Sequence, residues 1–128
     1  MREVPVISIV DDDESIRMAL SSLIRSMGWT AHVFESAQAF LDSGLVPAVS
    51  CLISDIQMPG MTGLELQQRL LDDGHRLPIV FITAFGSEAV RQQAMNHGAA
   101  HFLLKPLDPS VIEHCLHQLV GSGTGSDT

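Results

Sequence analysis

The sequence predicts an α/β fold in which a parallel five-stranded sheet is covered by helices on both faces, a three-layer sandwich. Apolar, β-branched runs such as "VPVISIV" (4–10) and "LPIVFIT" (77–83) are typical of strands buried on both faces. Segments with helical spacing of apolar residues separate these runs, and such strict alternation favours a parallel sheet. A chain of 128 residues that is 45% hydrophobic suffices for one domain with one core.

In the first half of the chain, each element has a local signal. The first helix is expected to end at Gly28, and Ser36 is a plausible N-cap for the second, which ends at Gly44. Alternating residues predict a short strand in "TAHVF", and a continuous apolar run predicts a buried one in "VSCLISD". The expected strands are 4–10, 30–34 and 49–55, and the expected helices are 16–27 and 37–44.

The second half continues the alternation after a turn-rich segment, "MPGMTG" (58–63). Gly74 ends the third helix, and the last helix begins with an Asp108 cap and Pro109 in its first turn. The fourth helix has only a thin apolar stripe. The expected helices are 64–74, 87–98 and 108–121, and the expected strands are 77–83 and 101–106. The composition of 121–128 is that of a flexible linker or tail, so the domain is expected to span 1–120.

The composition argues against nucleic-acid binding and against a membrane-spanning protein. The net charge of −8 argues against direct nucleic-acid binding, because phosphates would be repelled. No apolar run is long enough for a membrane span, and the N-terminus does not resemble a signal peptide. Cys51 and Cys115 lie among apolar neighbours, which indicates reduced core residues of a cytoplasmic protein.

Reactive side chains gather where the predicted strands end. Asp11 and Asp12 follow the first strand, Asp55 ends the third, Thr83 ends the fourth, and Lys105 ends the fifth and is the chain's one lysine. Because ligands of open parallel sheets bind outside the carboxyl ends of the strands, we expect these side chains to meet. Clustered carboxylates repel one another unless they hold a proton or a cation, and oxygen ligands without Cys or His suit Mg²⁺.

The predicted cluster suits phosphoryl chemistry. A carboxylate can act as a nucleophile toward phosphorus, and a metal, a lysine and a threonine hydroxyl can share the charge of the transferred group. Asp13 could equally be the cap of the first helix. His114 and His117 share a helical face, where exposed histidines are far more common than a metal pair.

The segments "VDDDE", "LISDIQMPGMTGLEL", "IVFITA" and "AAHFLLKP" together resemble the receiver domain of two-component response regulators over about residues 5–120. The stretch "SAQAFL" and the loop "TAFGS" resemble the FixJ-like branch in particular. The resemblance implies a flavodoxin-like fold with strand order 2-1-3-4-5. It also implies that Asp55 is the phosphoacceptor, that Asp11, Asp12 and the backbone carbonyl of Gln57 join it in binding Mg²⁺, and that Thr83 and Lys105 contact the phosphoryl group.

Further expectations come from the same resemblance. Thr83 and the aromatic Phe102 match the two switch positions of the family, and Ala84 matches a small residue beside the phosphate. The Lys105–Pro106 peptide is expected to be cis. Leu107 departs from the aromatic residue that many receivers have there. A sensor histidine kinase is the implied partner, with phosphorylation changing the 87–120 face and favouring a homodimer.

Three functions compete. The first is a phosphorylation switch, whose output is transcription through a DNA-binding domain absent from this chain, or protein–protein interaction as a stand-alone receiver. The second is an aspartyl-phosphate enzyme, which needs an acid two residues after the nucleophile where this chain has Gln57. The third is a pseudo-receiver, which would have lost one of the acids, Thr83 or Lys105. We expect the first, with only self-phosphorylation and slow autodephosphorylation as activity.

Overall fold

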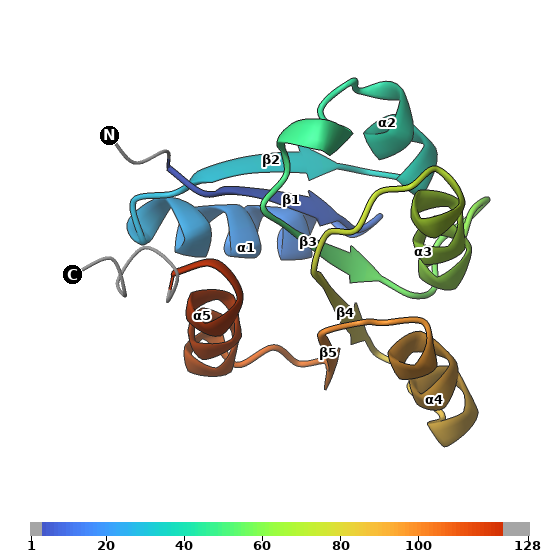
Figure 1. Ribbon diagram of the computed structural model, residues 1–128. Coiled ribbons are helices and arrows are strands. Elements are labelled where there is room, and N and C mark those ends of the chain that lie inside the picture. Colours follow the sequence, from blue (N-terminus) through green and yellow to red (C-terminus); the bar gives the residue numbers. More distant parts are fainter. Residues whose placement is uncertain (1–3, 122–128) are drawn as a thin grey trace.

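The computed structural model describes residues 4–121 and confirms the predicted α/β fold (Figure 1). Its five strands form one parallel sheet in the order β2-β1-β3-β4-β5. The strands are β1 (Val6–Val10), β2 (Thr30–Phe34), β3 (Cys51–Asp55), β4 (Ile79–Thr83) and β5 (His101–Leu104). This is the flavodoxin-like order that the resemblance implies. The order changes direction between β1 and β3, so the carboxyl ends of these two strands border the switch point.

Five α-helices cover the two faces of the sheet, as Figure 1 shows. On one face lie α1 (Glu14–Ser26) and α5 (Pro109–Leu116), and on the other lie α2 (Ala37–Asp42), α3 (Gly63–Asp72) and α4 (Glu88–Asn96). Two short turns complete the described elements: the 3₁₀ turn η1 (Val46–Ala48) and the π-helical turn η2 (His117–Gly121).

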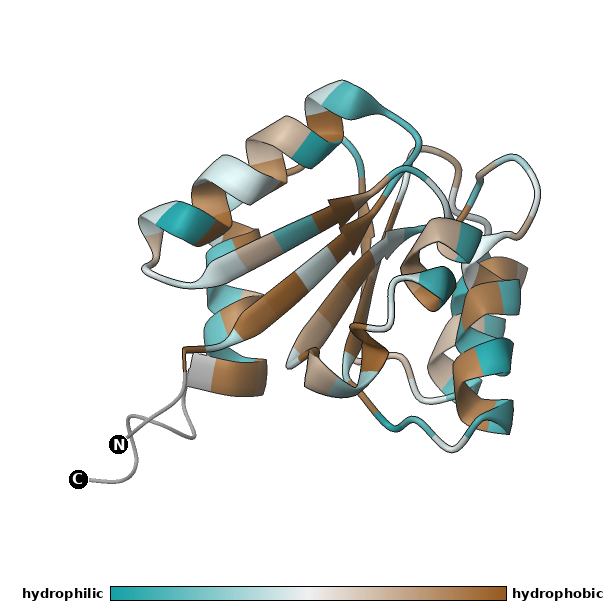
Figure 2. Cartoon of the chain, turned by 90° about the horizontal axis from the view of Figure 1, so that it is seen from above, coloured by the Kyte–Doolittle hydropathy of each residue, from teal (hydrophilic) through white to brown (hydrophobic). Residues whose placement is uncertain are grey.

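The sheet separates two apolar cores, and the central strands in Figure 2 are mostly hydrophobic. Alternate residues of each strand point to opposite faces, so Ile9 and Ile53 pack toward α1 and α5 while Val10 and Leu52 pack toward the other three helices. All five residues of β3 and all five of β4 are buried. This double burial explains why their sequences are continuous apolar runs.

The predicted capping residues occupy the positions expected of them. Asp13 Oδ1 accepts a hydrogen bond from the Ser15 amide at 2.9 Å, so this acid is the N-cap of α1. Ser36 and Asp108 cap α2 and α5 in the same way. The glycines expected to end helices have positive φ, as a left-handed C-terminal residue requires: Gly28, Gly44 and Gly74.

Several predicted boundaries were wrong. The strand expected to begin at residue 49 begins at Cys51, because residues 46–48 form η1. The strand expected from residue 77 begins at Ile79, and β5 ends at Leu104, so Lys105 lies just beyond it. The last helix is regular only to Leu116 and continues as the π-helical turn. The predicted linker at 121–128 lies outside the described residues except for its first glycine.

Both cysteines are free and buried, as predicted. Burial raises the pKa of the Cys51 thiol to about 12, with a further contribution from the neighbouring Cys115. Burial also raises the pKa of Cys115. A thiol whose pKa lies this high carries almost no thiolate at neutral pH, so both act as small apolar core residues. Within residues 4–121, no helix combines the length and hydropathy needed to cross a bilayer.

Candidate functional site

Three aspartates meet at the carboxyl edge of the sheet, as the sequence predicted. Asp11 follows β1 and is fully buried, Asp55 ends β3 and is 5% exposed, and Asp12 is exposed. One carboxylate oxygen from each lies within 4.8 Å of those of the other two. The parallel register of β1 and β3 brings their ends together, because Val10 pairs with Ser54.

Lys105 reaches this cluster from the end of β5. Its Nζ lies 3.1 Å from Asp11 Oδ2 and 3.4 Å from Asp55 Oδ2. Burial opposes the lysine's charge, but the ion pair with Asp11, followed by the contact with Asp55, outweighs it and raises the pKa of Lys105 above its usual 10.5. The ammonium therefore stays protonated and supplies a fixed positive charge between two carboxylates.

Asp55, the phosphoacceptor predicted by the resemblance, is subject to opposing electrostatic effects on its pKa. Burial and then the nearby charge of Asp11 raise the pKa of Asp55 above its ordinary value of 3.8, and the attraction of Lys105 only partly offsets them. The amide of Gln57 donates a hydrogen bond to Asp55 Oδ1 at 3.3 Å. One lysine is thus insufficient compensation for the carboxylates, and an additional cation would relieve the remaining repulsion.

The carboxylates fit a hard divalent cation on two grounds. Asp11 Oδ2 is buried and accepts no hydrogen bond within the described part of the chain, because the Lys105 contact is an ion pair without hydrogen-bond angles. In addition, Mg²⁺ holds oxygens at about 2.1 Å, so opposite ligands lie about 4.2 Å apart. The three carboxylate oxygens lie within 4.8 Å of one another, so they would have to draw slightly closer together around such an ion. No histidine or cysteine enters the cluster, which favours Mg²⁺ over softer metals.

Two residues that support the site were missed from the sequence. Arg17, in the first turn of α1, donates from Nη1 to the backbone carbonyl of Asp11 at 2.7 Å and so fixes the loop that carries the acids. Gly63 begins α3 with its amide donating to Ile56 O at 2.8 Å. A Cβ added at Gly63 would lie 2.3 Å from the Asp55 carbonyl oxygen. The glycine in "MTGLEL" can be read from the sequence. The need for a glycine there comes from its close approach to the Asp55 backbone, which only the structure shows.

The two proposed switch residues occupy neighbouring strands. Thr83 is buried, and its hydroxyl exchanges hydrogen bonds with the backbone of Phe85, at 3.1 Å from the amide and 3.3 Å to the carbonyl. Phe102 is half-buried beside the same loop, since a Cβ at Gly86 would lie 2.9 Å from its ring. The loop after β4 therefore contacts the aromatic side chain of β5 through Gly86.

The structure also shows where the remaining predicted residues lie. The Lys105–Pro106 peptide is cis, as the resemblance implied. Ala84 is exposed in the loop after β4. His114 and His117 join no metal-binding group among residues 4–121, and the ring of His117 packs edge-on against Trp29 at 5.2 Å. The predicted contribution of the Gln57 carbonyl to a metal stays a prediction.

The comparisons with known protein families and with individual proteins agree with one another. The family model described as the response regulator receiver domain matches residues 7–117. The chain is 45% identical over 101 residues to the response regulator protein TmoT of Ectopseudomonas mendocina, covering 79% of this chain and 46% of that protein. It is 37% identical over 106 residues to the transcriptional regulatory protein FixJ of Azorhizobium caulinodans, covering 83% of this chain and 50% of FixJ.

Comparison with solved structures points to the same family. The crystal structure of FixJ-N superposes with a TM-score of 0.80 at 32% identity, covering 93% of this chain and 94% of that one. The chain spans about half the length of the curated relatives it matches. The match extends over all five strands and the three aspartates, so this chain belongs to the response regulator receiver domain family of two-component systems.

Proposed function

We propose that the chain is a phosphorylation switch in which Asp55 accepts a phosphoryl group from a histidine kinase. The observation that carries the proposal is the arrangement of Lys105 Nζ, at 3.1 and 3.4 Å from the carboxylates of Asp11 and Asp55. A cation held between a buried nucleophile and a buried metal ligand is suited to an incoming phosphoryl group, which carries negative charge. Asp11, Asp12 and the backbone carbonyl of Gln57 would hold Mg²⁺ together with Asp55.

The proposed reaction forms a bond between an Asp55 carboxylate oxygen and phosphorus as the nitrogen–phosphorus bond of the kinase's phosphohistidine breaks. The electron pair of that bond remains on the imidazole nitrogen, which takes up a proton from water. Lys105 stabilises the charge on the transferred oxygens, and bound Mg²⁺ supplies further charge compensation. Thr83 would exchange its bonds with the Phe85 backbone for one to a phosphoryl oxygen.

We propose that turnover is slow, so that the chain signals rather than acting as an enzyme. Hydrolysis by an aspartyl-phosphate enzyme needs a general acid near the leaving oxygen, and the residue two places after Asp55 is Gln57, whose amide cannot donate a proton in this way. The phosphorylated state would therefore last long enough to be read by a partner. Only self-phosphorylation from a donor and slow autodephosphorylation would occur.

The proposed output is transcriptional. TmoT is a response regulator and FixJ a transcriptional regulatory protein, and each is about twice as long as the segment matched here. A DNA-binding domain outside this chain would supply the contact with DNA that a net charge of −8 disfavours. The buried free thiols fit a reducing compartment and support a cytoplasmic location.

The test is to incubate the protein with acetyl phosphate and Mg²⁺ and to measure its intact mass. One phosphoryl adduct per chain is expected for the unmodified protein and none for Asp55→Asn. Asp13→Asn is the matched control, because Asp13 caps α1 and asparagine caps equally well. It should label like the unmodified protein.

Each other outcome would reject the proposal in a defined way. Equal labelling of Asp55→Asn would reject the phosphosite. Release of inorganic phosphate at many turnovers per minute without an adduct would favour the aspartyl-phosphate enzyme. An absence of any reaction, with the fold intact, would favour a pseudo-receiver that only docks partners.

A further inference from the structure

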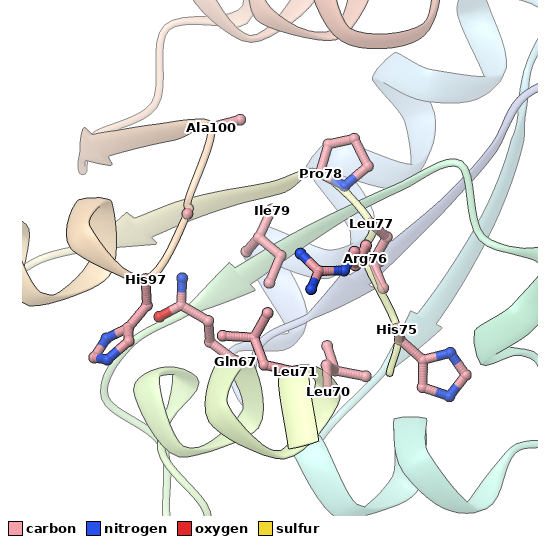
Figure 3. A pocket seen from close by; sticks show the side chains of 11 residues that line it. Gln67, Leu70, Leu71, His75, Arg76, Leu77, Pro78, Ile79, His97 and Ala100 are labelled. Carbon is pink, nitrogen blue, oxygen red and sulfur yellow. The ribbon is translucent and has the colours of Figure 1, made fainter. Parts of the chain in front are cut away.

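A second concave site lies at the opposite edge of the sheet from the carboxylates. A cavity of about 340 Å³ is bordered by the ends of α3 and α4 and by the residues that precede β4 and β5 (Figure 3). Small-molecule sites occupy about 300–1,000 Å³, so this cavity suits a compact ligand. It shares no lining residue with the phosphorylation site.

One side of the cavity is apolar and built from regular structure. Its wall consists of Leu70, Leu71, Leu77, Pro78 and Ile79. Leu70 and Ile79 belong to the core between the sheet and α3, at 1% and 6% exposure. Leu70 and Leu71 lie in α3 and Ile79 in β4, so this part of the wall exists before any ligand binds, and Leu77 and Pro78 extend it from the loop before β4. This is the usual condition for small-molecule pockets.

The polar side of the cavity is basic, although the protein is acidic. His75, Arg76 and His97 line it, and no aspartate or glutamate does. Figure 3 shows the Arg76 side chain extending from the α3–β4 loop toward the space beside Ile79 and Gln67. The nearby acids of α3 face elsewhere, because Asp73 pairs with Arg69 at 3.3 Å and Asp72 lines a separate hollow. In a chain of net charge −8, such a cavity favours an anion.

A buried contact between α3 and α4 holds Gln67, whereas His97 is exposed and contacts its own helix. Gln67 is 2% exposed, and its Nε2 donates to the Ala94 carbonyl at 3.0 Å. Its amide oxygen lies on the side of His97 in Figure 3. His97 Nδ1 lies 2.9 Å from Gln93 O, and that contact does not use Nε2. Gln67 thus gives the floor of the cavity a fixed polar group.

The C-terminal ends of α3 and α4 would repel an anion bound here, but some of their carbonyl groups already accept hydrogen bonds. The C-terminal turns of α3 and α4 carry partial negative charge. The His75 amide donates to Leu70 O at 2.8 Å, and the Ala99 amide donates to Ala94 O at 3.0 Å. These capping bonds satisfy carbonyls that would otherwise face the ligand. Arg76, an exposed side chain of the lining, adds a full positive charge.

We propose that this cavity binds a small organic acid with an apolar body and one carboxylate. The carboxylate would pair with the planar guanidinium of Arg76, which offers two parallel donors. The apolar body would cover the wall formed by the leucines and Ile79. A neutral apolar compound would leave Arg76 unused, and an inorganic anion would leave the wall exposed to water. The expected ligand therefore has both a carboxylate and an apolar body.

The test is a titration of the ¹⁵N-labelled full chain with three probes, followed by two-dimensional NMR. Benzoate should shift amides of residues 67–79 and 97–100 saturably. Benzamide, which has nearly the same shape without charge, should bind at least tenfold more weakly. Inorganic phosphate should also bind at least tenfold more weakly. Equal binding of benzamide or of phosphate would overturn the proposal, as would benzoate shifts that fail to saturate or spread over the whole surface.

Two arginine variants separate the cavity from general charge effects. Arg76→Gln should weaken benzoate binding about tenfold and leave benzamide binding unchanged. Arg69→Gln removes the same charge from α3 outside the cavity and should leave benzoate binding unchanged. An equal loss in both variants would mean that benzoate responds only to net charge, and the assignment of the site would fail. Thermal unfolding of both variants checks that the fold is retained.

Discussion

The proposed phosphorylation site of this receiver domain depends on how a few side chains share charge. Asp11 is buried beside Asp55 and is compensated by Lys105 alone among the charged groups of residues 4–121 at salt-bridge distance. Asp13, next in the sequence, has a different task, since its carboxylate caps α1. Asp11 and Asp13, two positions apart, therefore differ in role: one is buried in the carboxylate cluster and the other caps a helix.

Asp55→Asn should stabilise the metal-free protein at neutral pH. The raised pKa of Asp55 means that folding disfavours its ionised form, with burial first and Asp11 second as causes. The folded state therefore holds its proton to higher pH than the unfolded chain does. Stability from this group is complete below the ordinary pKa of 3.8 and is lost as pH rises through the raised value.

The measurement is urea unfolding of both proteins from pH 3 to pH 8 without metal. The variant should gain on the order of 1 kcal/mol at pH 7, and the gain should disappear toward pH 3. An advantage that is independent of pH would show that the carboxylate's ionisation is not its cause.

Gly63→Ala should lower the free energy of unfolding by about 1–3 kcal/mol and slow phosphorylation. The added Cβ would lie 2.3 Å from the Asp55 carbonyl oxygen, so either α3 or the peptide of Asp55 must move. Gly60→Ala is the comparison: it meets no atom within 4 Å but has a φ of +77°. It should cost stability through backbone strain and leave the rate of phosphorylation nearly unchanged. Equal phosphorylation rates in the two variants would contradict this account.

At the scale of elements, α4 is the least firmly packed of the five helices. Ala94 is its one buried residue, as the thin apolar stripe predicted. The main polar anchor is the buried side chain of Gln67, which links α3 to the carbonyl of Ala94. The adjoining loop places Phe85 and Gly86 between α4 and the site. A weakly held helix next to the proposed phosphorylation site is suited to change position.

Gln67→Met should loosen α4 without unfolding the domain. Methionine has a similar volume but cannot donate to Ala94 O, so about 0.5–1.5 kcal/mol should be lost locally. Hydrogen exchange should become faster in residues 88–100 and remain unchanged in α1. Gln68→Met on the exposed side of α3, where the amide contacts Asp72, should leave α4 exchange unchanged. Unchanged exchange in 88–100 for Gln67→Met would refute the anchoring role.

For the whole molecule, Mg²⁺ should raise the midpoint of thermal unfolding. Binding to the folded state alone stabilises it by mass action, and three carboxylates within 4.8 Å exist only in the fold. A rise of several degrees is expected at tens of millimolar Mg²⁺. Asp12→Ala should abolish it and should itself stabilise the metal-free protein slightly. A midpoint that ignores Mg²⁺ would exclude a metal site.

Phosphorylation should change the face formed by α4, β5 and α5 and favour a dimer. Phe85 is 74% exposed and Leu104 is 58% exposed, and Gly86, next to Phe85, lies close to Phe102 and Leu104. Burying such side chains against a second copy would repay the cost of a changed loop. Beryllofluoride, a phosphoryl mimic, should alter hydrogen exchange in 83–106 and raise the sedimentation coefficient. Changes confined to residues 14–44 would contradict this prediction, and a monomer at high concentration would reject the dimer.

The sequence by itself determined the alternation of strands and helices, the caps and the strand ends that carry Asp55, Thr83 and Lys105. These features follow from periodicity and neighbouring residues, which are local properties of the chain. The resemblance to receiver domains added strand order and roles. It did not indicate that Arg17 holds the Asp11 loop or that Gly86 touches Phe102.

Only the tertiary structure decided which distant residues touch. Lys105 and Asp55 are 50 positions apart and Gln67 and Ala94 are 27 apart, and nothing in either local pattern specifies the pairing. The basic cavity likewise appears only when the end of α3, the α3–β4 loop and the α4–β5 loop are brought together. Strand order and helix packing set these contacts, because they fix which strand ends and helix ends become neighbours in space.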